Sequence, residues 1–355
     1  MSKAIRWALL ALAAVAASAL GYRAWRQHQN ELALAIHTPN GIQEAMFVPA
    51  GGIGQWIEIR GEDRRNPVIL FLHGGPGASV TALSSLFKPW EKHFTVVMWD
   101  QRCSGKTFAL GGADSCKAMS IESVAREGNQ VAEFVRSRLH QDKIIVLGHS
   151  WGTMIGLRMI HDRPDLYSAY VGTGQVASIA EKEPVIYADA LKRVRAAHDD
   201  EGVRALQKIG PPPYKTFQDE GIERDWSERY DIPPERDLRA DMTPLVLFAP
   251  GWSLWDTYQT FERAQHYAEA ATFDADRNYD ARSLGPDFAV PVYVFNGEAD
   301  TITPTALARR WYDGIRAPKK DFVVLKGGGH SAVLTQPGAF LDALLQHLKP
   351  GASHG

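Results

Sequence analysis

A pentapeptide in the middle of the chain, residues 148–152, has the pattern G-x-S-x-G around Ser150. It directly follows a buried apolar run and precedes a helical pattern, which is the context in which this motif carries a nucleophilic serine. The flanking glycines permit a turn too tight for side chains, and the strained turn lifts the serine hydroxyl above the sheet. The start of a helix also favours developing negative charge. These residues predict nucleophilic catalysis by Ser150.

A serine hydroxyl needs a base, and among twelve histidines His330 has the position for that role. It follows three glycines, residues 327–329, in a loop behind the last apolar run of the chain, from which it can reach the serine. The imidazole needs an orienting carboxylate, which we expect from Asp300. Glu298 competes for this role, but the Thr-Ile-Thr-Pro after Asp300 is typical of a turn that faces the site.

Acyl transfer also requires hydrogen-bond donors for the oxyanion of the tetrahedral intermediate. One donor is expected to be the backbone N–H of Trp151, the residue after the nucleophile. The second is expected from the loop His73-Gly74-Gly75-Pro76-Gly77, in which Gly75 is the first choice and Gly74 the substitute. His73 is expected to organise this loop through hydrogen bonds, and it is also a candidate for contact with the substrate.

The elements that must position these residues alternate between strands and helices. Two early runs, residues 43–48 and 55–59, predict an antiparallel hairpin. Helical patterns such as residues 121–140 and 151–161 separate later apolar runs that suit strands buried on both faces. The sequence therefore predicts an α/β fold, a mostly parallel sheet covered by helices, with the polar motifs at the carboxyl ends of its strands. The predicted buried strands are Val68–Leu72, Phe94–Trp99, Lys143–Leu147, Ala169–Val171, Pro291–Phe295 and Asp321–Leu325.

One stretch, residues 177–285, breaks this alternation because it contains no convincing buried strand. Helical segments such as Glu183–Ala197 and proline-rich breaks predict a helical cap inserted between two strands. The expected organisation is a first core part over residues 38–176, the cap, and a second core part over residues 286–350. The last five residues are expected to fray.

The N-terminal 30 residues predict a signal peptide or a membrane anchor. Lys3 and Arg6 precede an uncharged apolar run, Trp7–Tyr22. The run is about as long as the apolar core of a signal peptide and slightly shorter than a transmembrane helix, which needs about 17 to 25 residues. Residues 17–19, Ala-Ser-Ala, fit the pattern before a cleavage site. A buried helix is the third alternative, although no polar face breaks the run. A cleaved signal and a retained anchor both place the folded part outside the cytoplasm, in the periplasm or at the membrane.

Charge and cysteine content exclude other classes of function. The net charge of −2 gives no electrostatic reason to expect a nucleic-acid partner. Cys103 and Cys116 lack the spacing and the neighbouring histidines of a zinc site, so no metal is expected. In an oxidising compartment a disulfide and two free thiols are equally compatible with the sequence.

Three motifs together resemble the prolyl iminopeptidase group of α/β-hydrolases: His73–Gly77, Asp100-Gln101-Arg102 and Ser150-Trp151-Gly152. The order of Ser150, Asp300 and His330 along the chain is also that of α/β-hydrolases. The resemblance covers residues 41–176 and 286–348, and it does not extend to the cap.

The resemblance implies a serine hydrolase that cleaves a short peptide from its N-terminal end without a cofactor. It also implies that acidic cap residues hold the substrate ammonium group, for which Glu181 and Glu183 are the first candidates, followed by Glu220 and Glu223. An esterase with the same triad is the close alternative. Epoxide hydrolases and dehalogenases share the fold but use an aspartate nucleophile, so a serine at position 150 argues against both classes. A non-catalytic binding protein is the last alternative.

Overall fold

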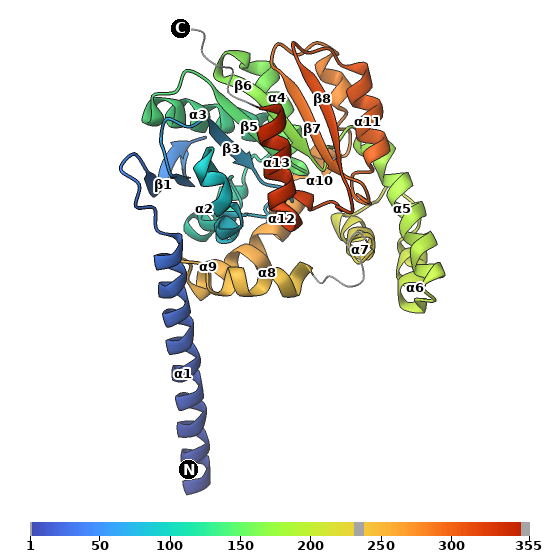
Figure 1. Ribbon diagram of the computed structural model, residues 1–355. Coiled ribbons are helices and arrows are strands. Elements are labelled where there is room, and N and C mark those ends of the chain that lie inside the picture. The colour runs from blue at the N-terminus through green and yellow to red at the C-terminus, as the bar shows by residue number, and fades with distance from the viewer. Residues whose placement is uncertain (1, 231–237, 349–355) are drawn as a thin grey trace.

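A single eight-stranded sheet runs through the computed structural model, which describes residues 2–230 and 238–348 (Figure 1). The strand order is β1-β2-β4-β3-β5-β6-β7-β8. β2 pairs antiparallel with β1 and β4, and all other pairs are parallel, which confirms the predicted fold class. The strands are β1 (Ile42–Ala50), β2 (Ile53–Gly61), β3 (Val68–Leu72), β4 (Thr95–Asp100), β5 (Ile144–His149), β6 (Tyr167–Thr173), β7 (Val292–Gly297) and β8 (Lys320–Leu325).

Two hydrophobic layers, one on each face of the sheet, explain why the central strands have no polar alternation. Leu70 of β3 packs into one layer and its neighbour Phe71 into the other, and both are fully buried. Since successive side chains of a strand point to opposite faces, a strand covered on both sides must be apolar throughout. The first layer is completed by α3 (Ile121–Leu139), α4 (Trp151–Asp162) and α11 (Thr305–Gly314), and the second by η1 (Thr81–Lys92) and α13 (Pro337–His347).

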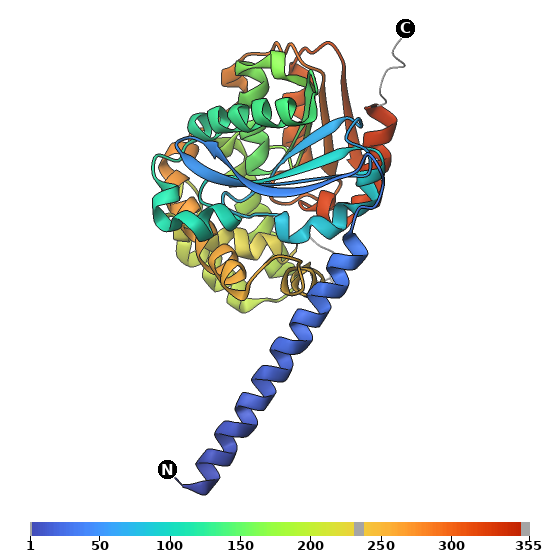
Figure 2. The same cartoon turned by 90° about the vertical axis from the view of Figure 1, so that its left-hand side faces the viewer.

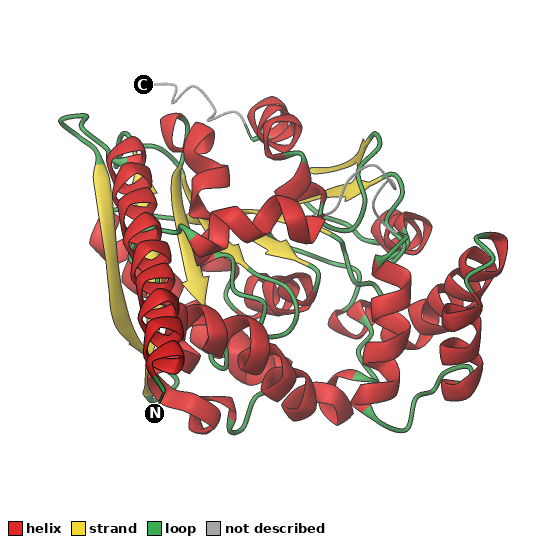
Figure 3. Ribbon diagram, turned by 90° about the horizontal axis from the view of Figure 1, so that it is seen from below, coloured by secondary structure: helices red, strands yellow, loops and turns green. Residues whose placement is uncertain are grey.

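The chain between β6 and β7 forms helices at the carboxyl ends of the strands, below the sheet in Figure 1. Its described residues contain no strand, as expected for the cap. Figure 3, a view from below, shows these helices in front of the strand ends. Two small apolar clusters hold the cap, one around Trp226 and one that joins Val246 and Trp252 to Leu83 of the core. The helices are α5 (Ile179–Ala196), α6 (Asp200–Ile209), α7 (Phe217–Glu228), α8 (Leu238–Leu247), α9 (Leu254–Tyr258) and α10 (Gln265–Asp276).

The N-terminal segment is one helix, α1 (Lys3–Leu34), that projects away from the body of the protein (Figures 1 and 2). Only Leu34 is buried, so the alternative of a buried domain helix is wrong. Its most apolar 18-residue window has a mean hydropathy of 1.8, which is enough to cross a membrane by length and composition. A signal sequence has the same properties, so anchor and signal both stay predictions. The C-terminal tail, residues 351–355, lies outside the described residues.

Cys103 and Cys116 form a disulfide, which decides between the two alternatives left by the sequence. The bond closes a loop with a sequence separation of 13 around α2 (Gly105–Gly111). Cross-linking a loop of about this length stabilises a protein by roughly 3 kcal/mol in the chain-entropy model. We expect the double substitution Cys103→Ala and Cys116→Ala to lower the free energy of unfolding by about 2–3 kcal/mol, measured by urea titration. An unchanged unfolding midpoint would show that the disulfide does not stabilise the native state.

Candidate active site

Ser150 occupies a sharp turn between β5 and α4, where its φ is 52° and its ψ is −119°. A positive φ is strained for a residue with a side chain. The two flanking glycines explain how the turn is possible. A Cβ on Gly148 would lie 2.5 Å from the carbonyl oxygen of Gly152, and a Cβ on Gly152 would lie 2.2 Å from the carbonyl oxygen of Leu72. The backbone therefore has the geometry that the G-x-S-x-G pattern predicts.

Asp300 and His330, which follow β7 and β8, meet side by side. The Nδ1 atom of His330 lies 3.1 Å from Oδ1 and 3.3 Å from Oδ2 of Asp300. A carboxylate in this position holds the proton on Nδ1 and leaves Nε2 as the basic nitrogen. The competing Glu298 is exposed and accepts a hydrogen bond from the backbone N–H of Gly327 at 3.0 Å, away from the imidazole. The structure thus pairs His330 with Asp300.

Thr303, which had no role assigned from the sequence, completes the binding of the Asp300 carboxylate. Its hydroxyl donates to Oδ2 at 2.6 Å and its backbone N–H donates to Oδ1 at 2.7 Å. Burial alone would raise the pKa of Asp300, but the neighbouring His330 and the hydrogen bonds from Thr303 hold it below its usual value. Asp300 is therefore a buried carboxylate that stays ionised next to the imidazole.

His149 and Gly174 hold the loop of His330 against the nucleophile turn. The ring centroids of His149 and His330 are 5.0 Å apart, and Nε2 of His149 lies 3.2 Å from the carbonyl oxygen of His330. Burial, followed by the proximity of His330, lowers the pKa of His149 to about 3, so that this ring is neutral. Gly174 has a φ of 55°, and a Cβ there would lie 2.8 Å from Cε1 of His330. His149 therefore packs beside His330.

The glycine-rich loop after β3 passes directly beside the nucleophile. A Cβ on Gly74 would lie 3.1 Å from the Cβ of Ser150. Gly75 has a φ of 108°, a conformation that side chains avoid. The cap packs on the same loop, since a Cβ on Gly77 would lie 2.8 Å from the Cα of Gln265 in α10. Gly75 and Trp151 thus lie on segments that adjoin Ser150 on either side, and their role as oxyanion donors stays a prediction.

His73 lies inside this loop, and both of its ring nitrogens contact the protein. It is fully buried, with Nδ1 2.9 Å from the carbonyl oxygen of Gly74 and Nε2 2.9 Å from the hydroxyl of Ser104. Burial lowers its pKa to about 4, so the ring is neutral. These contacts agree with the expected role of His73 in organising the loop, and its contact with the substrate stays a prediction.

Gln101 links the two segments that carry the expected oxyanion donors. Its side-chain amide donates to the carbonyl oxygen of His73 at 3.2 Å and accepts a hydrogen bond from the indole N–H of Trp151 at 3.1 Å. The sequence showed Gln101 only as part of a family motif. Its neighbours hold it in place, since Asp100 accepts a hydrogen bond from Thr81 and Arg102 pairs with Glu127. Gln101 therefore positions both sides of the site.

We expect Gln101→Leu to lower kcat for a small ester substrate by about 10- to 100-fold, less than the roughly 10²–10³ that follows loss of an oxyanion donor itself. The substitution removes both hydrogen bonds but no donor. Gln141→Leu, in the loop before β5, is the matched control and should leave kcat unchanged. Equal kcat values for Gln101→Leu and the parent would show that the bridge has no role in catalysis.

The acidic cap residues fall into different environments. Glu181 is half-exposed and pairs with Arg282 at 2.7 Å and Arg310 at 2.5 Å, and its contact with the substrate stays a prediction. Glu220 pairs with Arg224 at 2.7 Å. Both carboxylates are compensated by arginines near the surface, which leaves Glu183 and Glu223 as the two buried candidates.

Glu183 and Glu223 form a buried acidic pair on α5 and α7. Glu183 pairs with Lys182, and its Oε2 atom is buried without a hydrogen-bond partner among the described residues. Glu223 accepts a hydrogen bond from the hydroxyl of Ser227 at 2.6 Å. Burial, with a contribution from the charge of Glu183, raises the pKa of Glu223 to about 7. The hydroxyl of Thr301, next to Asp300, lies 3.4 Å from the carbonyl oxygen of Ser227 and connects this pair to the triad.

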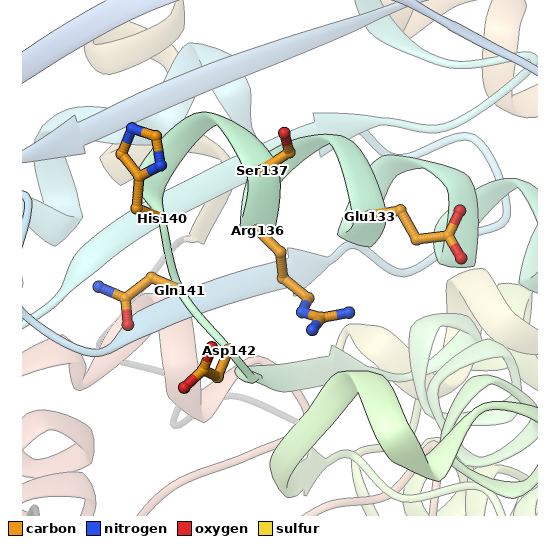
Figure 4. Close-up of a pocket in the computed structure, with 6 residues that line it drawn as sticks. All are labelled: Glu133, Arg136, Ser137, His140, Gln141 and Asp142. Carbon is orange, nitrogen blue, oxygen red and sulfur yellow. The ribbon is translucent and has the colours of Figure 1, made fainter.

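A polar hollow on the opposite side of the protein is not part of this site (Figure 4). It lies where α3 ends and the chain enters β5, at the amino ends of the parallel strands. Within residues 2–230 and 238–348 no group of three or more His, Cys, Asp or Glu side chains could hold a metal ion. The residues that line the hollow are Glu133, Arg136, Ser137, His140, Gln141 and Asp142.

Comparison with known proteins agrees with the fold. The model of the alpha/beta hydrolase fold family matches residues 67–337, and the chain belongs to this family. It is 27% identical over 305 residues to the probable aminopeptidase YbaC of Bacillus subtilis, which covers 84% of this chain and 94% of that protein. It is 23% identical over 300 residues to the proline iminopeptidase of Lactobacillus delbrueckii subsp. bulgaricus, covering 84% and 95%.

Among solved structures, the crystal structure of the proline iminopeptidase-related protein of Thermus thermophilus superposes with a TM-score of 0.62 at 20% identity, covering 86% of this chain and 97% of that one. The protein is therefore a hydrolase of the α/β-hydrolase family, with relatives named as peptidases.

Proposed function

We propose that this hydrolase is an aminopeptidase of the prolyl iminopeptidase type that acts through Ser150, His330 and Asp300. The observation that carries the proposal is the buried pair Glu183 and Glu223, because a peptidase that removes an N-terminal residue must hold a free ammonium group. A buried carboxylate oxygen without a hydrogen-bond partner among the described residues gives such a group a place to bind. The names of the sequence relatives support the same class of substrate.

In this mechanism the Oγ atom of Ser150 attacks the carbonyl carbon of the first peptide bond while Nε2 of His330 takes the hydroxyl proton. The N–H groups of Gly75 and Trp151 stabilise the negative charge on the carbonyl oxygen. The C–N bond then breaks, and the leaving amine takes the proton from His330. Water, deprotonated by His330, then attacks the acyl carbon, the bond to Oγ of Ser150 breaks, and Oγ takes the proton back from His330. Asp300 orients the imidazole and stabilises its charged form throughout.

A substrate panel separates this proposal from an esterase with the same triad. Prolyl and alanyl 4-nitroanilides with a free α-amine should be hydrolysed with a higher kcat/KM than their N-acetyl derivatives. If 4-nitrophenyl butyrate is cleaved and the nitroanilides are not, or if acetylation of the amine makes no difference, the enzyme is an esterase and the aminopeptidase proposal fails.

We expect Glu223→Gln to raise KM for prolyl 4-nitroanilide by about 10- to 100-fold, since a hydrogen bond to a charged group contributes roughly 1.5–3 kcal/mol. The kinetics of 4-nitrophenyl butyrate, which lacks an ammonium group, should not change. Glu220→Gln, on the same helix, is the matched control because its carboxylate is already paired with Arg224. An equal rise in KM for both substrates would show a general loss of structure instead.

The raised pKa of Glu223 predicts the pH dependence of substrate binding. Its carboxyl is neutral below pH 7 and charged above it, because burial raises its pKa to about 7. Attraction of an ammonium group therefore grows as the pH rises, and KM for the nitroanilide should fall between about pH 6 and pH 8. Above about pH 8 the substrate amine loses its own proton and KM should rise again. In Glu223→Gln the fall on the acid side should disappear; its persistence would exclude Glu223 as the titrating group.

We also propose that α1 is retained as a membrane anchor and that the catalytic domain lies outside the cytoplasm. The proposal is supported by the exposed apolar residues of α1 and by the disulfide, which is typical of an oxidising compartment. Membranes washed with carbonate should retain the full-length protein, with its N-terminal sequence intact. A mature protein that begins after Ala19 would instead identify the segment as a cleaved signal.

A further inference from the structure

Large apolar side chains are exposed on the cap next to α1. They belong to the helical segment that begins with α9 and continues through η4 (Gln259–Ala264). The exposed fractions are 47% for Leu254, 56% for Trp255, 49% for Tyr258 and 44% for Phe261. We call these four residues the α9 patch. The rings of Trp255 and Tyr258 contact each other, with centroids 5.6 Å apart. A clustered group of exposed aromatic residues indicates an interaction surface.

The segment carries three charged residues, Asp256 in α9 and Glu262 and Arg263 in η4. The one in α9 does not oppose an apolar contact. Asp256 forms a capping box with Ser253: its Oδ2 accepts hydrogen bonds from the backbone N–H at 2.8 Å and from the hydroxyl at 2.7 Å. The carboxylate is thus directed to the start of α9 and is only partly exposed. The outward side of α9 is therefore dominated by Leu254, Trp255 and Tyr258.

Polar side chains of α1 bind the cap just before α9. Arg23 donates to the carbonyl oxygen of Trp252 at 2.7 Å, and Gln27 donates to that of Ala249 at 2.7 Å. Asn30 donates to the carbonyl oxygen of Phe248 at 3.0 Å. These bonds join the second half of α1 to the chain between α8 and α9, which lies alongside it in Figure 1. The depth of α1 in a membrane therefore sets the depth of this part of the cap.

Tyr22 places that part of the cap at the membrane surface. It is the last residue of the apolar run, and its ring packs edge-on against Phe248 with centroids 5.8 Å apart. Tyr22 and Trp25 are both 54% exposed. In membrane-spanning helices, exposed tyrosine and tryptophan at the end of the apolar run lie among the lipid headgroups. Phe248 contacts Tyr22 and therefore lies near the lipid headgroups. The α9 patch begins a few residues after Phe248 along the chain.

We propose that the α9 patch lies in the headgroup region of the bilayer that holds α1, so that the cap rests on the membrane. The inference depends on the proposed retention of α1. Tryptophan and tyrosine suit this position because the apolar ring contacts the acyl chains while the polar N–H or O–H group contacts the hydrated headgroups. The occupant of the patch is thus a lipid surface, and the membrane-bound cap would face substrates that arrive along the bilayer.

Three single-cysteine variants of the full chain test the proposal in vesicles of phosphatidylethanolamine and phosphatidylglycerol. The native cysteines are joined in a disulfide, so a maleimide fluorophore labels only the introduced thiol. Leu12→Cys reports insertion of α1, and Trp255→Cys reports the α9 patch. Asp142→Cys reports the loop between α3 and β5, at the amino ends of the parallel strands (Figure 4). Brominated lipids should quench the probes at positions 12 and 255 by at least twofold and leave the probe at position 142 unchanged.

The outcomes separate the patch from the anchor. Quenching at position 12 without quenching at position 255 would leave the anchor in place and overturn the membrane contact of the cap. Quenching at neither position would overturn both. A probe at position 255 that is shielded from iodide but not quenched by brominated lipid would show a protein partner, such as a second copy of this chain, and would also overturn the proposal. Adding Tyr258→Glu to Trp255→Cys should reduce the quenching by lipid, because a carboxylate disfavours the apolar contact.

Discussion

Replacing Ser150 by alanine is expected to lower kcat for every hydrolysed substrate by about 10⁶-fold, the effect of removing the nucleophile from a serine hydrolase. In the proposed mechanism the substitution removes the atom that forms the acyl-enzyme, whereas the fold should persist because alanine is smaller and the turn is held by its glycines. Binding of substrate should remain. Stopped-flow and steady-state assays of the parent and the variant with a good ester substrate measure the ratio.

A structural control makes this result specific. Thr153, one turn into α4, donates its hydroxyl to the carbonyl oxygen of Ser150 at 2.6 Å. Thr153→Ser keeps that hydrogen bond and should retain most of the activity. If Ser150→Ala hydrolyses the ester at more than about a hundredth of the parental rate, Ser150 is not the nucleophile.

Replacing Asp300 by asparagine is expected to lower kcat by about 10⁴-fold with little change in KM. Asparagine has nearly the same shape, but its amide no longer stabilises the charged imidazole and can hold His330 in the wrong tautomer. The Nδ1 atom of His330 lies within 3.3 Å of each carboxylate oxygen of Asp300, so the substitution acts directly on the base. The measurement is kcat as a function of pH for parent and variant.

Glu298→Gln is the matched control for this prediction, since Glu298 lies two residues earlier in the same loop. Its carboxylate contacts only the backbone of Gly327 among the hydrogen bonds described for the chain, and kcat should change by less than about threefold. A large loss in Glu298→Gln together with a small loss in Asp300→Asn would reverse the assignment of the orienting carboxylate.

The sheet could be predicted from the sequence because its signal is local. Runs such as Val68–Leu72 are buried on both faces and therefore apolar at every position. The first hairpin also followed from its pattern, although its strands extend to Ile42–Ala50 and Ile53–Gly61. The candidate triad could be predicted because each member lies close behind a strand, and the carboxyl ends of parallel strands share one edge.

Roles that depend on distant partners could not be predicted. The partners of His73 are Gly74 and Ser104, and nothing around His73 in the sequence shows that Ser104 would occupy its second nitrogen. Glu181 meets Arg282 and Arg310, which lie more than a hundred residues later. The sequence alone therefore cannot distinguish an acidic cap residue that pairs with an arginine from one that is buried near the site.

The extent of the N-terminal helix also depends on distant partners and could not be predicted from the sequence. The sequence indicated an apolar run that ends at Tyr22, whereas the helix continues to Leu34. The continuation is stabilised by bonds from Gln27 and Asn30 to backbone carbonyls more than 200 residues away. Backbone acceptors carry no signature in the sequence, so this contact could only be seen in the folded structure.

Covalent labelling of Ser150 tests the central claim most directly. The parent protein is treated with a fluorophosphonate, digested and analysed by mass spectrometry. We predict a single adduct, on the hydroxyl of Ser150, that forms much more slowly in His330→Ala because the base is missing. Absence of an adduct in an active preparation, or an adduct on another residue while activity is lost, would contradict the assignment of Ser150 as the nucleophile.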